Sequence, residues 1–390
     1  MYRIGQEEID AVARAIMSRD FFKINDSGRE VLNFEKEWSS LTGAEYTQLM
    51  TSGFAALTAA LIGLDIGPGD EVIVPAYTYI ASALAVVAAG AIPVVAEVDE
   101  TLTIDPVDVE KKISAHTKAV MPVHIQGFPS NMDSLKALAQ KYNIAIVEDA
   151  CQADGGMYKG QYLGTIGDVG AYSFNYYKVI TAGEGGALVT NNRSIYEKAL
   201  IYHDSGAVAF FGDQLNGFTQ PLFCGMEFRV SDITGAILRE QLKKLPSILS
   251  DLRKNRDALA ALVCGEGKAL QVPSNDIQGD CGTTLALRFE TEEACRKYQK
   301  KCSEQGIGST APIDTGKHVY KNWTQIMEKK GAWHPAMDPF RMKENQGLQM
   351  DYSEDMCPKT LDLLSRTLYF GISPDWTDTD IARMAAVMNS

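Results

Sequence analysis

The chain has 390 residues, more than a single hydrophobic core usually supports, so two domains are expected. Apolar residues make up 45% of the sequence and charged residues 22%, as in ordinary globular proteins. The formal net charge of −13 argues against nucleic acid or an anionic membrane surface as the main partner.

Two helices are expected at the start of the chain. Residues 6–18 carry apolar side chains at helical spacing, and the same period continues through Phe34 and Trp38. Next, Thr51-Ser52-Gly53 precedes an apolar helical run over residues 55–64. Small residues at a helix N-terminus expose backbone N–H groups that can bind an anion. An ordinary Ser/Thr N-cap explains the same residues equally well.

From residue 71 onward, predicted strands and helices alternate. The strands are expected at 71–74, 92–98, 118–123 and 144–147, and the helices between them at 79–89, 106–113 and 132–142. This βαβ series implies a parallel sheet covered on both faces, in which ligands bind beyond the carboxyl ends of the strands. The side chains that follow these ends are Tyr77, Tyr79, His124, Asp149 and Gln152. No G-x-G-x-x-G motif follows the first strand, so a dinucleotide site has little support.

A single lysine, Lys178, follows the strand-like run that ends in Ser173-Phe174, and a glycine-rich turn, Gly183-Glu184-Gly185-Gly186, comes next. A lysine in a turn is usually a solvated charge. Here Tyr176, Tyr177, Val179 and Ile180 surround it, and desolvation lowers the pKa of a lysine so that its amine becomes nucleophilic. Such an amine can form a Schiff base with pyridoxal phosphate. Nearby glycines allow backbone to approach a bulky cofactor.

Asp149 lies 29 residues before Lys178, which leaves room for a hairpin and one more strand. An acidic residue at a strand end is often the N-cap of a following helix. Alternatively, its carboxylate pairs with a protonated pyridine nitrogen and makes the ring an electron sink. The placement of both Asp149 and Lys178 at strand ends favours the second interpretation.

The C-terminal part is expected to form a smaller domain. Long helical segments over 231–263 would lead from a large domain (1–245) into a small one (246–390). Within the small domain we expect a strand at 284–289 and helices at 292–305 and 376–389. A polar and aromatic segment runs from His318 and Tyr320 to His334-Pro335. Long irregular segments are often binding loops, although surface packing explains any single residue equally well.

Taken in order, these motifs resemble the DegT/DnrJ/EryC1/StrS sugar aminotransferases, which are fold-type I pyridoxal-phosphate enzymes. The resemblance extends from about residue 5 to the C-terminus. The best-matching pieces are Ser52-Gly53, the run from Gly69 to Pro75, the run from Glu148 to Ala153, Ser173-Phe174 with Lys178, and the run from Gly183 to Gly186. The resemblance implies an α/β large domain with a mostly parallel, helix-covered central sheet and a smaller α+β C-terminal domain.

The resemblance also assigns roles to residues. Lys178 would form the Schiff base and shuttle a proton, and Asp149 would hold the pyridinium. Tyr79 would stack on the ring, and Gln152 would lie near the phenolic oxygen. The remaining assignments are the phosphate contacts, made by Ser173 and the backbone of Ser52, Gly53 and Phe54, and a substrate contact in the region of His318 and Tyr320. No metal is implied.

Two positions depart from the family pattern. Phe54 stands where the family usually has threonine, so one phosphate-binding hydroxyl is lost. The family motif Gly-x-Asn-x-Arg, whose asparagine reaches the neighbouring subunit's phosphate, reads Gly225-Met226-Glu227-Phe228-Arg229 here. Glu227 would therefore face a phosphate unless it is protonated or paired with a cation. Lys23 and Lys317 are possible partners, and we expect it to turn toward Arg229.

The sequence thus predicts a pyridoxal-phosphate aminotransferase that moves an amino group from glutamate or glutamine to a ketone on a sugar, sugar nucleotide or keto-cyclitol. One alternative is a sugar dehydratase, although Lys178 replaces the histidine of the family's dehydratase branch. Another is a cofactor-poor, non-catalytic homologue, suggested by Phe54 and Glu227. We expect a homodimer, because the family site is completed across a dimer interface. Seven scattered cysteines and no leader or membrane span fit a cytoplasmic protein.

Overall fold

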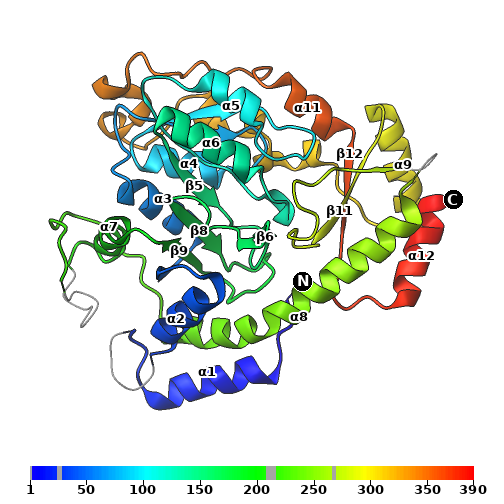
Figure 1. Ribbon diagram of the computed structural model, residues 1–390, viewed down its shortest axis with the longest axis horizontal. Helices are drawn as coiled ribbons and strands as arrows, with labels where there is room; N and C mark the ends of the chain where they lie inside the picture. Colours follow the sequence, from blue (N-terminus) through cyan, green and yellow to red (C-terminus); the bar gives the residue numbers. More distant parts are fainter. Residues whose placement is uncertain (1, 24–28, 208–216, 266–268) are drawn as a thin grey trace.

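The computed structural model describes residues 2–23, 29–207, 217–265 and 269–390. Helices α1 (Gln6–Ser18) and α2 (Glu30–Thr42) form where the apolar spacing predicts them. Both lie beside the first half of the long helix α8 (Asp232–Val263) at one end of the molecule (Figure 1). Phe34 and Trp38 are fully buried, so the face of α2 that the sequence identified is its core face.

A seven-stranded sheet forms the centre of the described chain, in the order β1-β9-β8-β5-β4-β2-β3. Its strands are β1 (Tyr46–Met50), β2 (Glu71–Pro75), β3 (Ile92–Ala96), β4 (Thr117–Val120), β5 (Ala145–Asp149), β8 (Val169–Ser173) and β9 (Gly186–Thr190). All neighbours pair in parallel except β9, which is antiparallel to both β8 and β1. The expected mostly parallel sheet is therefore confirmed.

Helices connect and cover these strands (Figure 1). They are α3 (Gly53–Gly63), α4 (Ala81–Ala88), α5 (Pro106–Lys112), α6 (Met132–Tyr142) and α7 (Arg193–His203). Several predicted elements were longer than the observed ones, among them α4 and β4. Helix α4 begins at Ala81 rather than residue 79, and the residues before it pair with another segment instead, through Thr78 N–H to His318 O (3.0 Å) and Ile80 N–H to Lys317 O (2.9 Å). Strand β4 ends at Val120, two residues before Pro122, which has no N–H to donate to a sheet.

The hairpin expected between Asp149 and the next strand is present as β6 (Met157–Tyr158) and β7 (Gln161–Tyr162). The buried Glu148 carboxylate fixes the loop after it by accepting from the N–H groups of Gly164, Ile166 and Gly167. His124, expected at a ligand-binding strand end, supports the same carboxylate and is fully buried. Its Nδ1 accepts from Ser130 N–H, so Nε2 carries the proton and donates to Glu148 (3.1 Å). His124 is therefore a structural residue.

The predicted helical segments over 231–263 are one continuous 32-residue helix, α8, despite the internal Pro246. Helix α8 runs from the central sheet to the C-terminal part, so the predicted boundary at 245/246 falls inside it (Figure 1). There a three-stranded antiparallel sheet, β10 (Leu270–Gln271), β11 (Thr284–Arg288) and β12 (Thr367–Gly371), packs with α9 (Glu292–Glu304) and α12 (Asp378–Asn389). The division into two domains stays a prediction.

Residues 312–357 are mostly irregular and pack back on the large sheet. The segment contains α10 (Thr324–Met327) and a series of 3₁₀ turns, and it leads into α11 (Pro358–Ser365). Asn345 binds the backbone of Gly69 and Gly90, and Gln349 binds Glu71 at the start of β2. This polar segment is therefore largely a cover for the edge of the sheet that carries β2 and β3.

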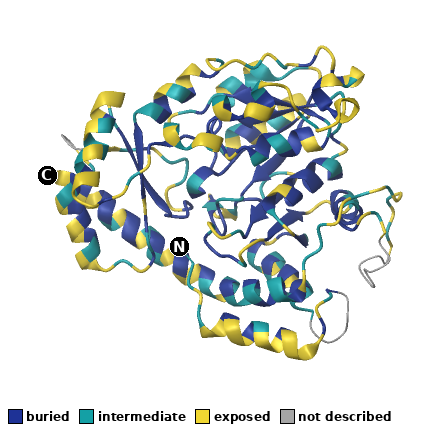
Figure 2. Ribbon diagram, turned by 180° about the vertical axis from the view of Figure 1, so that it is seen from behind, coloured by how far each residue is buried: buried dark blue, intermediate teal, exposed yellow. Residues whose placement is uncertain are grey.

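The core follows the two faces of the central sheet, where strands and the inner faces of the helices are buried (Figure 2). Exposed residues gather on the outer faces of the helices, and α1 is the clearest example. Within the described ranges no helix is both long and apolar enough to cross a membrane.

Candidate active site

Asp149 ends β5, and its carboxylate is fixed from two sides. Its Oδ2 accepts from the Ser82 hydroxyl on α4 (2.7 Å), and its Oδ1 accepts from the Cys151 backbone N–H (3.1 Å). Ser82 is itself paired with the Thr78 hydroxyl (2.8 Å). The residues after Asp149 form turns rather than a helix, so the helix N-cap interpretation is wrong. The carboxylate is almost fully buried at the carboxyl end of the sheet, with its orientation set by α4.

Lys178 lies in the turn after β8 and is half-buried. Two of the four neighbours expected to desolvate it do not, because Tyr176 and Tyr177 are 59% and 75% exposed. Val179 and Ile180 are buried beneath the turn. Beside it, burial raises the pKa of the Asp154 carboxyl well above its usual range, and the charge of Lys178 opposes this shift. Lys178 therefore lies close enough to a buried acid for their charges to interact, and it lines a cavity rather than being enclosed by aromatic rings.

The N-terminus of α3, the end of β8 and the start of β9 meet in close backbone contact. Ser52 caps α3, with its Oγ accepting from Ala55 N–H (3.1 Å), so the N-cap interpretation is correct for the side chain. A Cβ on Gly53 would lie 2.9 Å from the Ser173 Cβ, and one on Gly186 would lie 2.3 Å from the Ser52 carbonyl carbon. The first N–H groups of a helix have no partner within the helix. Capping and anion binding are therefore compatible here, because the cap uses only one of these groups.

Phe54 and Glu227, the two departures from the family pattern, flank this junction. The Phe54 side chain is partly exposed at the start of α3. The Thr51 N–H donates to Phe228 O (3.1 Å), which ties the segment with Glu227 to the chain just before Ser52. The Glu227 carboxylate accepts from Arg229 N–H (3.0 Å) and forms an ion pair with its guanidinium (2.7 Å). The expected turn of Glu227 toward Arg229 is therefore confirmed.

Tyr79 and His318 form one wall of the site. Their ring centroids lie 5.3 Å apart with the planes tilted by 53°. The contact is held by backbone pairing of residues 76–80 with 317–320, including Thr78 N–H to His318 O (3.0 Å). Burial and the nearby charge of Lys178 lower the pKa of His318, so this wall favours a neutral imidazole.

Tyr320, predicted together with His318, does not belong to this wall. It is fully buried, its hydroxyl donates to Glu354 O (2.6 Å), and the same oxygen accepts from Cys357 N–H (3.2 Å). Its neighbour His318 faces the cavity, whereas Tyr320 belongs to the core beneath the irregular segment. The prediction that Tyr320 contacts substrate is therefore wrong.

Gln152 faces the same cavity, beside three residues that sequence reasoning missed: Gln126, Asn175 and Thr283. Gln152 Oε1 accepts from the Gln126 backbone N–H (3.0 Å). The Gln126 carbonyl accepts from the hydroxyl of Thr283, which comes from the C-terminal part of the chain (2.6 Å). Gln126 lies in the turn Ile125–Gly127 that follows β4, and its place beyond a strand end was the available signal for it. Thr283 carries no comparable signal, because only the fold brings it near.

The cavity that these residues line has a volume of about 470 Å³. Its lining combines Tyr79, Gln152, Lys178 and His318, which were predicted, with Gln126, Asn175, Tyr177, Val179 and Thr283. The described residues contain no His, Cys, Asp and Glu group suited to a metal ion.

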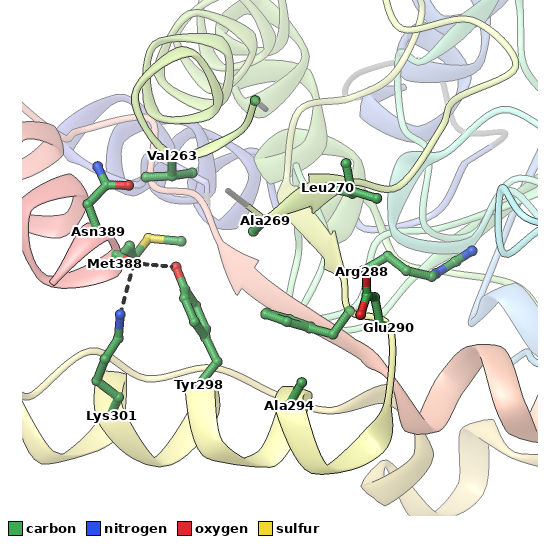
Figure 3. Close-up of a pocket in the computed structure, with 12 residues that line it drawn as sticks. Val263, Ala269, Leu270, Arg288, Glu290, Ala294, Tyr298, Lys301, Met388 and Asn389 are labelled. Carbon is green, nitrogen blue, oxygen red and sulfur yellow. Dashed lines mark hydrogen bonds between the residues drawn. The ribbon is translucent and has the colours of Figure 1, made fainter. Parts of the chain in front are cut away.

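A second hollow of about 730 Å³ lies between α9, α12 and the β10–β11 edge (Figure 3). There Tyr298 and Lys301 both donate to the Met388 carbonyl (2.7 and 3.1 Å), so their polar groups are already used (Figure 3). None of the predicted site residues lines it. The smaller cavity at Lys178 is therefore the candidate active site.

The residues at this end of the sheet fit pyridoxal phosphate. A primary amine, an oriented carboxylate and a helix N-terminus are the three groups that its aldehyde, ring nitrogen and phosphate require. Lys178, which lines the cavity, is the amine. Asp149 at the end of β5 is the carboxylate, and the start of α3 packs against Ser173 at the end of β8.

Comparisons with known proteins agree with this chemistry. A model of the DegT/DnrJ/EryC1/StrS aminotransferase family matches residues 3–389. The dTDP-3-amino-3,6-dideoxy-alpha-D-galactopyranose transaminase of Aneurinibacillus thermoaerophilus is 34% identical over 328 residues, which cover 82% of this chain and 85% of that protein. The structure of an aminotransferase from Psychrobacter cryohalolentis has a TM-score of 0.83 and 28% identity, covering 100% of this chain and 97% of that one. An S. venezuelae structure in complex with a ketimine intermediate has a TM-score of 0.79 and 28% identity, covering 98% and 93%.

These findings confirm the resemblance expected from the sequence, together with the fold class, aminotransferase activity and pyridoxal phosphate as cofactor. They favour an aminotransferase over both a dehydratase and a non-catalytic homologue.

Proposed function

We propose that this chain, which belongs to the DegT/DnrJ/EryC1/StrS aminotransferase family, transfers an amino group from glutamate or glutamine to a ketone on a sugar nucleotide or a related keto-sugar or keto-cyclitol. The observation that carries the proposal is the convergence of Lys178, the oriented Asp149 carboxylate and the N-terminus of α3 around one end of the sheet. The substrate class is supported by the similarity to a dTDP-sugar transaminase.

Each residue would have a distinct role in the reaction. Pyridoxal phosphate, when bound, supplies a ring that withdraws electrons from the substrate carbon next to nitrogen. Lys178 holds the cofactor and, when released, takes a proton from one carbon and returns it to another. Asp149 favours the positive charge on the ring nitrogen. Backbone N–H groups of Gly53 and Phe54 with Ser173 hold the phosphate, at the positive end of the α3 dipole.

The walls of the cavity fit a neutral, hydroxyl-rich acceptor. Apart from Lys178 and the apolar Val179, the described lining residues carry amide, hydroxyl, phenol and imidazole groups. Burial and the neighbouring lysine hold the pKa of His318 below its ordinary value, which favours a neutral imidazole near neutral pH. Its Nδ1–H donates to Thr315 O (3.4 Å), so Nε2 is left as an acceptor. Such groups bind sugar hydroxyls through hydrogen bonds and leave any phosphate of a nucleotide to lie outside the cavity mouth.

The proposal is tested by incubating the protein with pyridoxal phosphate, glutamate or glutamine, and panels of keto-sugars, their nucleotide derivatives and keto-cyclitols. Mass spectrometry would detect replacement of a carbonyl oxygen by an amine. Lys178→Ala and Lys178→Arg should both abolish turnover, because neither side chain can form the imine. Lys297→Ala, which removes an exposed lysine on α9, should keep it. Substantial turnover by Lys178→Ala, or loss of oxygen without gain of nitrogen, would contradict the proposal.

A further inference from the structure

A backbone feature near the cavity is not explained by the chemistry described so far. Gln126 has φ +54° and ψ +19°, in the left-handed region that residues other than glycine rarely adopt. It lies in the turn Ile125–Gly127 after β4, and Gly127 follows with φ +80°. A Cβ on Gly127 would lie 2.5 Å from the Cys281 Cβ. The turn is therefore pressed against residues 281–284 of the C-terminal part.

Three hydrogen bonds hold Gln126 in this conformation. Its carbonyl accepts from the Thr283 hydroxyl (2.6 Å), and its side-chain Oε1 accepts from the Thr284 hydroxyl (3.0 Å). Its backbone N–H donates to Gln152 Oε1 (3.0 Å). Thr283 and Thr284 are both buried, which limits the access of water to their hydroxyls, although Thr283 also lines the cavity.

The bond from Gln126 determines which end of the Gln152 amide is free. A backbone N–H can only donate, so the Gln152 atom that meets it must be the oxygen. The Gln152 NH₂ is then the end left for a ligand. Gln152 and Gln126 line the same cavity as Lys178, so this NH₂ is a hydrogen-bond donor available to a group bound there.

We propose that Gln126 is a positioning residue that orients the Gln152 amide with its NH₂ toward the cofactor's ring oxygen, and that Thr283 and Thr284 hold Gln126 in place from the C-terminal part. This proposal rests on the proposed function and on the expectation from the family resemblance that the ring oxygen lies near Gln152. It makes the contact between the two parts of the chain a determinant of the electronic state of the cofactor.

The test measures the visible spectrum of the protein reconstituted with pyridoxal phosphate as a function of pH. A donor to the ring oxygen stabilises its anionic form, so losing that donor should raise the pH midpoint of the spectral change. Thr283→Val should raise the midpoint by about half a pH unit or more and weaken pyridoxal phosphate binding about threefold. Thr283→Ser keeps the hydroxyl and should restore the original midpoint.

Two further variants separate positioning from general loss of stability. Thr367→Val removes another buried hydroxyl of the C-terminal part, one that donates to Leu363 O (2.7 Å) far from Gln126. It should lower the thermal midpoint without moving the spectral one. Thr284→Val removes the second bond to Gln126 and should shift the midpoint in the same direction as Thr283→Val, which keeps the proposal testable if Thr283→Val fails to fold.

A double-mutant comparison decides whether Thr283 acts through Gln152. In a Gln152→Leu background, Thr283→Val should cause no additional shift, because the donor is already absent. An equal shift in both backgrounds, or no shift in Thr283→Val with the cofactor bound, would overturn the positioning role while leaving the proposed function intact. A wild-type protein that develops no visible band with pyridoxal phosphate would overturn the proposed function itself, and this proposal with it.

Discussion

At the scale of single residues, Asp149 shows how a strand-end carboxylate acquires a direction. Each of its oxygens already accepts one bond, from Ser82 on α4 and from the Cys151 N–H, and the Ser82 hydroxyl is itself paired with that of Thr78. A free carboxylate would rotate, whereas this one can present the same lone pairs to a ring nitrogen at every turnover.

Asp149→Asn should therefore still allow pyridoxal phosphate to bind but slow turnover by about 10³-fold, because a neutral amide cannot stabilise a positive ring nitrogen. Single-turnover kinetics with glutamate, followed in the visible spectrum, would measure the slow step. Ser82→Ala is the matched variant. It keeps the carboxylate charge of Asp149 but removes one of the bonds that orient it, so turnover should fall much less than in Asp149→Asn. Near-normal turnover in Asp149→Asn would remove Asp149 from its role.

Glu227 gives the second prediction at this scale. Two unit charges about 4 Å apart repel by roughly 1 kcal/mol in water and about 4 kcal/mol at an effective dielectric near 20. The Glu227 side chain is 50% exposed and paired with Arg229, so its repulsion of the phosphate should be close to the value in water. Glu227→Asn should tighten pyridoxal phosphate binding about two- to fivefold at low salt, and the gain should shrink as salt rises.

Titration of the cofactor-free protein with pyridoxal phosphate at several salt concentrations checks this, with Glu293→Gln on α9 as a control for the loss of one exposed negative charge. Weaker binding in Glu227→Asn would show that the carboxylate supports the site.

At the scale of elements, the sequence predicts those helices, strands and site residues whose positions depend on neighbouring residues in the chain. Apolar spacing located α1, α2 and the βαβ series, the 29-residue gap between Asp149 and Lys178 left room for the hairpin before β8, and strand ends located Asp149 and Gln152. The sequence did not separate His318 from Tyr320, because ring side chains two residues apart in an irregular segment differ only in the side to which the backbone turns them. Thr283 could not be predicted as a site residue, because its contact with Gln126 joins residues 157 apart in the sequence. The antiparallel order of β9 and β1 likewise depends on long-range pairing.

The junction of β9 with α3 gives a prediction about packing between elements. A Cβ on Gly186 would lie 2.3 Å from the Ser52 carbonyl carbon, which is backbone and cannot move aside cheaply. Gly186→Ala should displace the N-terminus of α3, lower the thermal midpoint and weaken pyridoxal phosphate binding about tenfold. Gly371→Ala in β12 is the matched control, because a Cβ there meets nothing within 4 Å. Equal binding by the two variants would show that the α3 N-terminus does not hold the phosphate.

At the scale of the whole molecule, several large apolar side chains near the site stay exposed in a single chain. They are Phe54 at the start of α3, Met226, and the two tyrosines before Lys178. They lie on three segments, and the one with Met226 is tied to the chain next to Ser52 by the bond from Thr51 to Phe228. Exposed apolar side chains beside a binding site are typical of a protein interface, and we propose that a second copy of the chain covers them.

The resulting prediction is a homodimer whose interface includes Met226. Met226→Asp should shift sedimentation velocity profiles from dimer toward monomer, because an unpaired carboxylate would be buried at the interface. It should also weaken pyridoxal phosphate binding, since the phosphate end of the site would lose its cover. Leu270→Asp is the control: Leu270 is 63% exposed, against 55% for Met226, but lies on β10 at the edge of the C-terminal sheet. It should leave both the sedimentation profile and the affinity for pyridoxal phosphate unchanged. An active wild-type monomer would refute the dimer, and a Met226→Asp variant that remains dimeric with full affinity would place the interface elsewhere.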